Sequence, residues 1–248
     1  MKKDTAWTEA AKWYDGLVAK DGHIYHQEII FPKLKQWCAF KKGDAVLDLG
    51  CGQGVLARHL PDGVDYVGID LAKPLIEQAK KRSSHTFLMR DATQALFLEK
   101  KDFSHVLMIL SLQNMKQGAQ AIYNGASHLR KGGKMILVLN HPCFRIPRQS
   151  SWGIDEAKKW QYRRIDRYYT PLEIPLDIHP SAGKESKKTL SYHHPLSTYI
   201  KWMRDNQFLI TQLEEWVSHK SSTGKWAKRE NQARKEFPLF LALEGTIR

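Results

Sequence analysis

The sequence feature that most constrains the fold is an apolar run that ends in three closely spaced glycines. Residues 45–49 read Ala-Val-Leu-Asp-Leu, and Gly50, Gly52 and Gly54 follow at alternate positions. Glycine lets the backbone turn sharply and leaves no Cβ between the main chain and a ligand. Residues 55–60 predict a helix start, whose free N–H groups favour a nucleotide-like ligand. The pattern therefore predicts the first strand of an α/β sheet with a cofactor at its carboxyl end.

Apolar runs alternate with helical patterns over most of the chain, which is typical of a parallel sheet. Strands are expected near residues 45–49, 64–69, 86–90, 104–110, 134–140, 162–169, 188–193, 208–216 and 237–246. Helices are expected near residues 54–60, 74–82, 118–130 and 195–206, with a basic, helix-prone segment at about 219–235. The glycines of Lys131-Gly132-Gly133 are suited to ending the helix at 118–130.

We expect a single domain, residues 1–248, with two additions to the alternating pattern. Residues 1–42 carry aromatic anchors and predict an N-terminal helical cap. Residues 143–194 are rich in aromatic residues, arginine and proline, and they are too long for an idle loop in a compact domain. This segment therefore predicts a lid or substrate-binding insert after the fifth strand of the sheet.

The acidic residues around the glycine turn narrow the choice of cofactor. Asp48 precedes the turn, Asp70 ends the next expected strand, and the glycine spacing departs from the G-x-G-x-x-G of dinucleotide-binding folds. Residues 47–54 resemble the first motif of the class I S-adenosylmethionine (SAM)-dependent methyltransferases. Within that family the chain is most similar to the small-molecule group related to ubiquinone- and menaquinone-biosynthesis methyltransferases (methyltransferase type 11).

The resemblance covers about residues 43–142 and 195–248, and it implies a fold. The expected architecture is an α/β fold with a Rossmann-like seven-stranded sheet and helices on both faces. Its final strand is antiparallel and lies between its neighbours, and the insert follows the fifth strand. The insert itself has no counterpart in the resemblance.

The resemblance also implies which residues contact SAM. Asp70 would accept both ribose hydroxyls through its carboxylate oxygens, and Leu71 would pack against the adenine. Asp91 matches the acidic position that accepts from the adenine amino group, although aspartate is also favoured as a helix N-cap. The expected cofactor-binding residues are Asp48, Gly50, Cys51, Gly52, Gly54, Asp70, Leu71, Asp91, Ala92, Leu110 and Ser111.

Methyl transfer from a sulfonium depends mainly on positioning, because SAM already carries the activated group. A base is needed only where the acceptor must lose a proton. The first candidate is His141, which directly follows the fifth expected strand, where strand ends face the cofactor crevice. Tyr192, His193 and His194 are alternatives, although adjacent residues of a strand point to opposite faces, so at most one of the two histidines faces the site.

The acceptor is expected to contact aromatic and basic residues of the N-terminal segment and the insert. Aromatic rings would wall a pocket, and arginines would hold a carboxylate or phosphate. The expected acceptor residues are Tyr14, Tyr25, Arg145, Arg163, Tyr192 and His193. The histidines show no paired ligand spacing, so no metal site is expected.

Two more specific methyltransferase activities are not favoured, because the sequence motifs that mark them are missing. The Asn- or Asp-Pro-Pro-Tyr motif of amino methylation is replaced by Leu-Ser-Leu-Gln-Asn at residues 110–114. Cys143 has the place of the nucleophile of RNA cytosine-5 methyltransferases, but the companion Asp-x-Pro-Cys is missing after the fourth strand. A free cysteine is more often a small hydrophobic residue.

Charge and cysteine content bear on nucleic-acid binding and on cellular location. The net charge of +13 makes contact with a polyanion plausible, but no run of five or six like charges marks a nucleic-acid arm, so solvated faces are favoured. Three scattered cysteines and the lack of a membrane-length apolar run favour a cytoplasmic protein. The preferred function is SAM-dependent methylation of a small-molecule acceptor. An RNA methyltransferase and a non-catalytic SAM-binding or interaction protein remain alternatives, and the oligomeric state is open.

Overall fold

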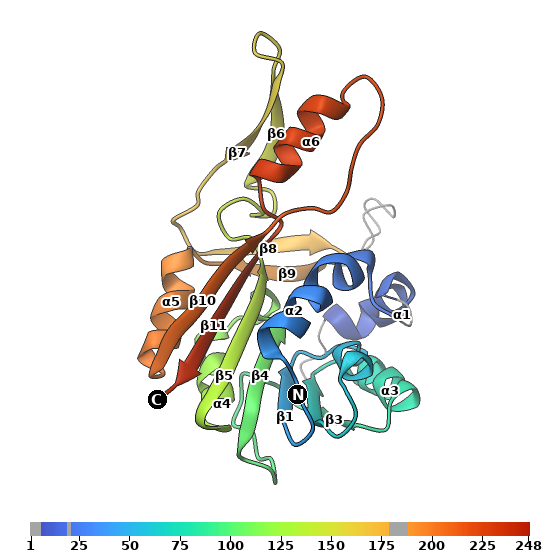
Figure 1. The fold of residues 1–248 in the computed structure, drawn as a ribbon, viewed down its shortest axis with the longest axis vertical. Coiled ribbons are helices and arrows are strands. Elements are labelled where there is room, and N and C mark those ends of the chain that lie inside the picture. The colour runs from blue at the N-terminus through green and yellow to red at the C-terminus, as the bar shows by residue number, and fades with distance from the viewer. Residues whose placement is uncertain (1–5, 19–20, 179–187) are drawn as a thin grey trace.

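The computed structural model describes residues 6–18, 21–178 and 188–248 and has a central seven-stranded sheet (Figure 1). Its strands are β1 (Ala45–Leu49), β2 (Asp65–Asp70), β3 (Thr86–Met89), β4 (Phe103–Ile109), β5 (Leu129–Asn140), β10 (Phe208–Trp216) and β11 (Phe240–Ile247). The strand order is β10-β11-β5-β4-β1-β2-β3. Strands β1 to β5 are mutually parallel, and β11 is antiparallel to β10 and to β5. The predicted seven-stranded sheet with an antiparallel final strand is confirmed.

Helices cover both faces of the sheet, and the alternation of side chains along β1 shows which helix lies on which face. Val46 packs in one core cluster with residues of α2 (Phe31–Cys38) and α3 (Lys73–Arg82). Leu47 and Leu49 pack in a second cluster with α4 (Gly118–Ala126) and α5 (Leu196–Asp205). Because both faces are covered, β1 is buried at every position, as expected for a central parallel strand. A short π-helix, η1 (His26–Ile30), leads into α2, and α1 (Ala6–Val18) packs against α3.

Two predicted helices differ from the structure. The segment expected at 54–60 is helical only over the 3₁₀ turn η2 (Leu56–His59). The helix expected at 118–130 ends at Ala126, and the glycines that were expected to cap it lie within β5. Gly133 is needed there for close packing, because a Cβ would lie 2.8 Å from the carbonyl oxygen of Arg130 and 3.1 Å from that of Phe103. The glycine pair therefore serves the start of a strand beside β4 and does not end a helix.

The insert after β5 forms two antiparallel hairpins. The first joins β6 (Ser150–Asp155) to β7 (Trp160–Ile165), and the second joins β8 (Leu172–Asp177) to β9 (Lys188–His193). The β6–β7 hairpin and α6 (Ala227–Glu236) project together from the sheet, whereas β8 and β9 lie across the upper ends of its strands (Figure 1). Strand β9 packs against α1 and against the 3₁₀ turn η3 (Leu112–Asn114), which follows β4. Strands β6 and β8 were not predicted. In the described part of the chain, no helix is long and apolar enough to cross a bilayer.

Candidate active site

The glycine turn after β1 is held between the ends of β1 and β4. Gly50, Gly52 and Gly54 have φ values of 81°, 55° and 72°, in the left-handed region that favours glycine. The Ser111 hydroxyl donates a 2.6 Å hydrogen bond to the Leu49 carbonyl, and a Cβ on Gly50 would collide with the Ser111 side chain. Only glycine allows this close approach, so the end of β4 fixes the shape of the turn.

Asp70 at the end of β2 ties the turn to the neighbouring strand. Its Oδ2 accepts a 2.9 Å hydrogen bond from the Gly52 N–H, and its Oδ1 accepts one of 2.8 Å from the Ala72 N–H. Burial raises the pKa of the Asp70 carboxyl, and these backbone hydrogen bonds oppose the rise. Each carboxylate oxygen has a second lone pair, so Asp70 can accept further hydrogen bonds besides those from Gly52 and Ala72.

Asp48 is a buried carboxylate with only half of its hydrogen-bonding capacity used. Its Oδ2 accepts a 2.8 Å hydrogen bond from the Tyr66 hydroxyl, whereas its buried Oδ1 has no partner among the described residues. Burial raises the pKa of Asp48 to about 7, against the lowering effect of the Tyr66 hydrogen bond, and the nearby charge of Asp70 raises it further. Buried polar atoms are nearly always paired, so the free oxygen indicates a place for a ligand that donates protons or carries positive charge.

Asp91, Ala92 and Leu110 lie at the same edge, because the carboxyl ends of parallel strands meet there. Asp91 follows β3, and its Oδ1 accepts hydrogen bonds of 2.9 Å from the Thr93 N–H and 2.7 Å from the Thr93 hydroxyl. Leu110 follows β4 with a φ of 53°, and its carbonyl accepts a 3.0 Å hydrogen bond from Gln113. The structure therefore brings the expected cofactor residues of β1, β2, β3 and β4 to one edge, and their contacts with a cofactor remain predictions.

The helix α1 covers the glycine turn, an arrangement that the sequence did not predict. The Tyr14 ring lies over Gly52, where a Cβ would come within 3.4 Å of it, and burial raises the pKa of the Tyr14 phenol, helped by the charges of Asp70 and Asp48. The next residue, Asp15, forms a two-pronged ion pair of 2.6 and 2.8 Å with Arg82 of α3. Arg82 also donates to the Gln53 side chain in the turn itself.

Comparison with known proteins shows which proteins this chain resembles. Residues 46–133 match the model of a methyltransferase domain. Carboxy-S-adenosyl-L-methionine synthase from Desulfotalea psychrophila is 27% identical over 192 residues, which is 68% of this chain and 76% of that protein. A ubiquinone biosynthesis O-methyltransferase from Azorhizobium caulinodans is 24% identical over 180 residues, 68% of this chain and 71% of that protein. The crystal structure of an S-adenosylmethionine-dependent methyltransferase from Mesorhizobium loti superposes with a TM-score of 0.66 at 21% identity, over 87% of this chain and 96% of that one.

Residues 46–133 are therefore similar to a methyltransferase domain, and the fold is that of the SAM-dependent methyltransferase structures. The residues at the strand ends fit SAM, which carries a positive sulfonium, an ammonium group and a ribose diol. The unpaired Oδ1 of Asp48 suits a cationic or N–H-bearing group, and the free lone pairs of Asp70 suit the two ribose hydroxyls. These residues and the glycine turn are the part of the structure that could hold SAM.

His141 directly follows β5 but is engaged at both ring nitrogens. It is 1% exposed, its Nε2 lies 2.6 Å from Glu215 Oε1, and the Cys143 N–H donates to its Nδ1 at 3.1 Å. Because Nδ1 accepts a hydrogen bond, Nε2 carries the proton and donates it to Glu215, which leaves the neutral ring without a free lone pair. Burial lowers the pKa of His141, and Glu215 opposes this. In this conformation the His141 ring stabilises the turn after β5. A role for His141 as a general base remains a prediction.

The turn that His141 holds carries Arg145. The backbone N–H groups of Phe144 and Arg145 donate to the His141 carbonyl at 3.2 and 2.8 Å. The Arg145 guanidinium is half-buried, and among the described residues it has neither a hydrogen-bond partner nor a carboxylate within ion-pair distance. Burial lowers the pKa of Arg145, and only the phenol of Tyr25 opposes this. An unpaired, partly desolvated guanidinium is a ready site for a carboxylate or phosphate.

Tyr25 forms an aromatic wall beside Arg145. Its ring packs edge-on against Phe240 at 5.6 Å and His219 at 5.8 Å, measured between ring centroids. The Lys220 ammonium lies 5.2 Å from the centre of the same ring. Burial lowers the pKa of nearby His23, and the charges of Lys220 and His219 lower it further. This corner is therefore positively charged, and no carboxylate contributes to the pKa shifts of Arg145 or His23.

The other expected acceptor residues have partners of their own. Arg163 donates to the Phe144 carbonyl at 2.8 Å and to the Ser150 hydroxyl at 2.6 Å, so it braces the turn that carries Arg145. His193 is buried, with Nε2 2.7 Å from the Tyr168 carbonyl. Tyr192 lies opposite Glu173 in the β8–β9 hairpin. These contacts are structural, and acceptor binding by Arg163, Tyr192 or His193 remains a prediction.

Gln113 is a site candidate that the sequence did not single out. Its amide nitrogen donates to the Leu110 carbonyl, and its buried Oε1 has no partner in the described part of the chain. It lies in η3 at the end of β4, between the cofactor strands and β5. The signal that marks Gln113 as a candidate is its buried amide oxygen without a donor. Burial of this kind depends on tertiary structure, so the sequence alone does not reveal it.

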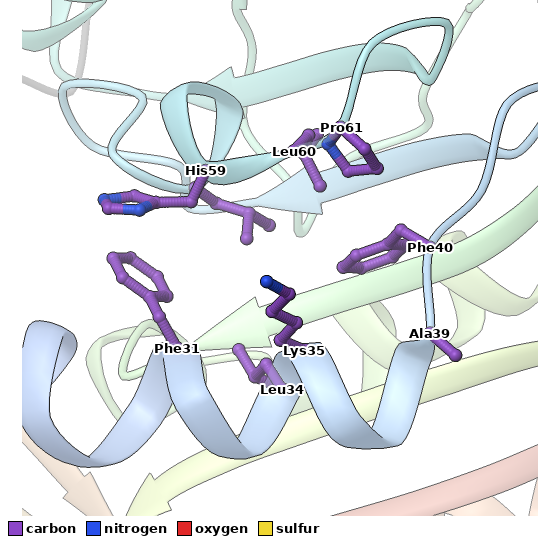
Figure 2. Close-up of a pocket in the computed structure, with 9 residues that line it drawn as sticks. Phe31, Leu34, Lys35, Ala39, Phe40, His59, Leu60 and Pro61 are labelled. Carbon is purple, nitrogen blue, oxygen red and sulfur yellow. The ribbon is translucent and has the colours of Figure 1, made fainter.

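A separate groove lies between α2 and η2 (Figure 2). It has a volume of about 370 Å³ and apolar walls that include Phe31, Phe40 and Leu60. The Lys35 side chain points into it, and His59 lies at its rim facing Phe31 (Figure 2). None of the expected cofactor or acceptor residues lines this groove, so we do not assign it to the methyl-transfer site.

Proposed function

We propose that this methyltransferase transfers the methyl group of SAM to a small anionic acceptor bound beside Arg145 and Tyr25. The observation that carries the proposal is the half-buried Arg145 guanidinium, which has no carboxylate partner among the described residues. Removing a charge from water without pairing it is unfavourable, and an anionic ligand would supply the missing partner. Lys220 would add to the positive potential around that anion.

The cofactor side would bind SAM through groups that are already in place. Asp70 would accept the ribose hydroxyls, and Asp91 would accept from the adenine amino group with the carboxylate oxygen that Thr93 leaves free. Asp48 would accept from the methionine part through its unpaired Oδ1. Tyr14 would exclude water from the glycine turn. When bound, SAM supplies an activated methyl group on a positive sulfonium.

Only β4 lies between β1 and β5 in the sheet. The acceptor side would therefore be close to the cofactor side. An anion at Arg145 would sit past the end of β5, and Tyr25 would offer an aromatic surface to the uncharged part of the acceptor. Alignment of the acceptor with the methyl group would supply most of the rate. The names of two relatives, a ubiquinone biosynthesis O-methyltransferase and a carboxy-S-adenosyl-L-methionine synthase, support a small acceptor.

The test is a comparison of acceptors matched in shape but not in charge. Aromatic carboxylates and phosphate esters would be incubated with SAM beside their neutral amides and methyl esters, and S-adenosylhomocysteine would be measured. We expect turnover with at least one anion and none with its neutral match, and we expect Arg145→Gln to remove the difference. Equal turnover of both forms, or turnover only with RNA, would overturn the small anionic acceptor. Failure of calorimetry to detect SAM binding would overturn the cofactor assignment separately.

A further inference from the structure

The projecting part of the molecule concentrates positive charge. We call it the arm and define it as the β6–β7 hairpin (150–165) together with the segment that carries α6 (217–237), which rise together above the sheet (Figure 1). The arm contains ten lysines and arginines against four aspartates and glutamates. Its excess of six positive charges is nearly half of the net charge of +13, in 37 of the 248 residues.

The acidic residues of the arm neutralise only part of this charge. Glu156 pairs with Arg229 at 3.5 Å, Glu230 with Arg234 at 3.6 Å, and Asp155 with Lys158 at 3.9 Å. The fourth, Glu236, lines the groove between β7 and α6. Apart from Lys220, which contacts Tyr25, four lysines of the arm have no acidic partner among the described residues: Lys159, Lys225, Lys228 and Lys235.

Large aromatic rings lie exposed among these cations. Trp160 is 59% exposed, Tyr162 49% and Trp226 45%. The Trp226 ring lies next to both Lys225, whose ammonium is 4.5 Å from the ring centre, and Arg229, at 3.9 Å. Trp160, Tyr162 and Arg229 line a groove of about 470 Å³ between β7 and α6. Exposed aromatic residues gathered in one place mark a binding surface.

The chemistry of this surface favours single-stranded nucleic acid over a membrane. Unstacked bases bind to exposed aromatic rings while neighbouring cations bind the phosphates. A duplex hides its base faces, so it would leave the rings unused. Helix α6 reads Ala-Lys-Arg-Glu-Asn-Gln-Ala-Arg-Lys-Glu and has no apolar residue larger than alanine, so it lacks the apolar face that inserts into a lipid surface.

We propose that the arm binds single-stranded nucleic acid, with bases stacked on Trp160 and Trp226 and phosphates on the unpaired lysines. None of these tryptophans and lysines is a residue assigned above to SAM or the acceptor, so the proposal does not depend on which acceptor is methylated. RNA and single-stranded DNA share the chemistry that the arm would recognise. The test includes both.

The first test measures binding to the full chain by fluorescence anisotropy. Labelled oligouridylate and oligothymidylate of about 20 nucleotides would be titrated with protein at about 50 and about 200 mM KCl. We expect binding that weakens steeply with salt, because each phosphate contact contributes about −0.7 to the slope of log K against log salt for a single strand. Preference for one of the two oligonucleotides would identify the natural strand. No binding of either at the lower salt would overturn the proposal.

Matched variants separate the arm from the general positive charge of the protein. Replacing Lys159, Lys228 and Lys235 by serine should lower the salt slope by about 2, from about 0.7 for each contact. The control replaces three exposed, unpaired lysines of the body, Lys80, Lys81 and Lys101, with the same loss of charge. An equal effect of the two triple variants would show that binding is unspecific attraction to the whole molecule, and it would overturn the proposal.

Aromatic variants test the stacking. The double change Trp160→Ala and Trp226→Ala should weaken binding by about tenfold or more, since each stacked base contributes about 1–3 kcal/mol. The control double change, Phe97→Ala and Tyr123→Ala, removes two exposed rings of the body, 86% and 56% exposed, and should leave binding unchanged. Thermal melting would confirm that both variants fold. Unchanged binding by the tryptophan variant, or sedimentation with anionic lipid vesicles in place of oligonucleotide binding, would overturn the proposal.

Discussion

The two sides of the carboxyl edge of the sheet use their charged groups in opposite ways. On the β1–β2 side, Asp70 accepts two backbone hydrogen bonds and shapes the turn before any ligand arrives. Past the end of β5, backbone hydrogen bonds hold the turn that carries Arg145, while the charge of its guanidinium has no partner among the described residues. The first side is organised by contacts within the protein, and the second is organised around something that must come from outside.

This difference suits two different kinds of ligand. A preformed turn suits a cofactor that is the same in every turnover, because little ordering remains to be done on binding. An unpaired cation suits discrimination between acceptors, because a ligand without the matching charge leaves the guanidinium desolvated and unpaired. Variants on each side should therefore change different measured quantities.

The largest effect is expected from Asp70→Ala, which removes both the acceptor for the ribose and the tie to Gly52. We expect SAM affinity to fall by about 100-fold or more, because hydrogen bonds to charged groups contribute about 1.5–3 kcal/mol each. Calorimetry with SAM measures this directly. Asp65→Ala, at the exposed start of the same strand, is the control and should bind SAM normally. Normal SAM binding by Asp70→Ala would remove the basis for a preformed cofactor side.

Arg145→Gln should affect the other side alone. With an anionic acceptor, we expect KM to rise by about ten- to 100-fold, the range for loss of a charge-assisted contact of about 1.5–3 kcal/mol. The SAM affinity should not change. Arg148→Gln is the matched control, because Arg148 lies three residues away and already has Asp177 at 3.7 Å. If Arg145→Gln weakened SAM binding and left the acceptor KM unchanged, the assignment of the two sides would be wrong.

Asp48 gives the cofactor side a pH dependence. Its carboxyl has a pKa of about 7 in the folded protein, raised first by burial, so it is mostly protonated below pH 7 and ionised above. Only the ionised form attracts a cationic ligand, so SAM affinity should increase as pH rises through about 7, and binding below pH 7 should release protons. Calorimetry in buffers of different ionisation enthalpy measures that release. Asp48→Asn should abolish it, and an unchanged pH profile in this variant would contradict the role of Asp48.

The same pKa predicts the sign of a stability effect in the absence of SAM. The pKa of Asp48 is raised above its value of about 4 in an unfolded chain. The unfolded state therefore loses this proton first as pH rises, so the contribution of Asp48 to stability decreases between about pH 4 and about pH 7. Urea unfolding across this range should show a smaller decrease for Asp48→Asn than for the unmodified protein. An equal decrease in both proteins would show that Asp48 ionises normally.

The sheet could be predicted from the sequence because its central strands are apolar runs between helical patterns. Strands β6 and β8 could not, since neither has a clear alternation of buried and exposed residues: β6 has no buried residue, and β8 has one. Helix α4 was predicted too long because Lys131-Gly132-Gly133 has the composition of a helix end, whereas in the structure Gly133 allows close packing against β4. Local composition does not distinguish these two uses of glycine.

For the candidate site, the sequence indicated residues at strand ends but not the residues that hold them. Asp48, Asp70 and Asp91 lie in or after apolar runs, and they could be identified from the resemblance of residues 47–54 to a known motif. The partner of Asp48 is Tyr66, in the next strand, and the free lone pair of His141 is removed by the Cys143 N–H. These contacts depend on register and on a turn conformation. Neither leaves a mark in spacing or composition.

The smallest effect, and the one that most sharpens the comparison, concerns α1. The Asp15–Arg82 ion pair holds α1, with Tyr14, over the glycine turn, although 67 residues separate the two in the chain. If α1 belongs to the cofactor side, Asp15→Asn and Arg82→Gln should each weaken SAM binding by about two- to fivefold, consistent with a partly exposed pair worth up to about 1 kcal/mol. The double variant should be no weaker than Arg82→Gln alone, because that change already breaks the pair. Stopped-flow dissociation of SAM should locate the effect in a faster off-rate, while the acceptor KM stays unchanged. An increase in acceptor KM with normal SAM dissociation would instead assign α1 to the acceptor side.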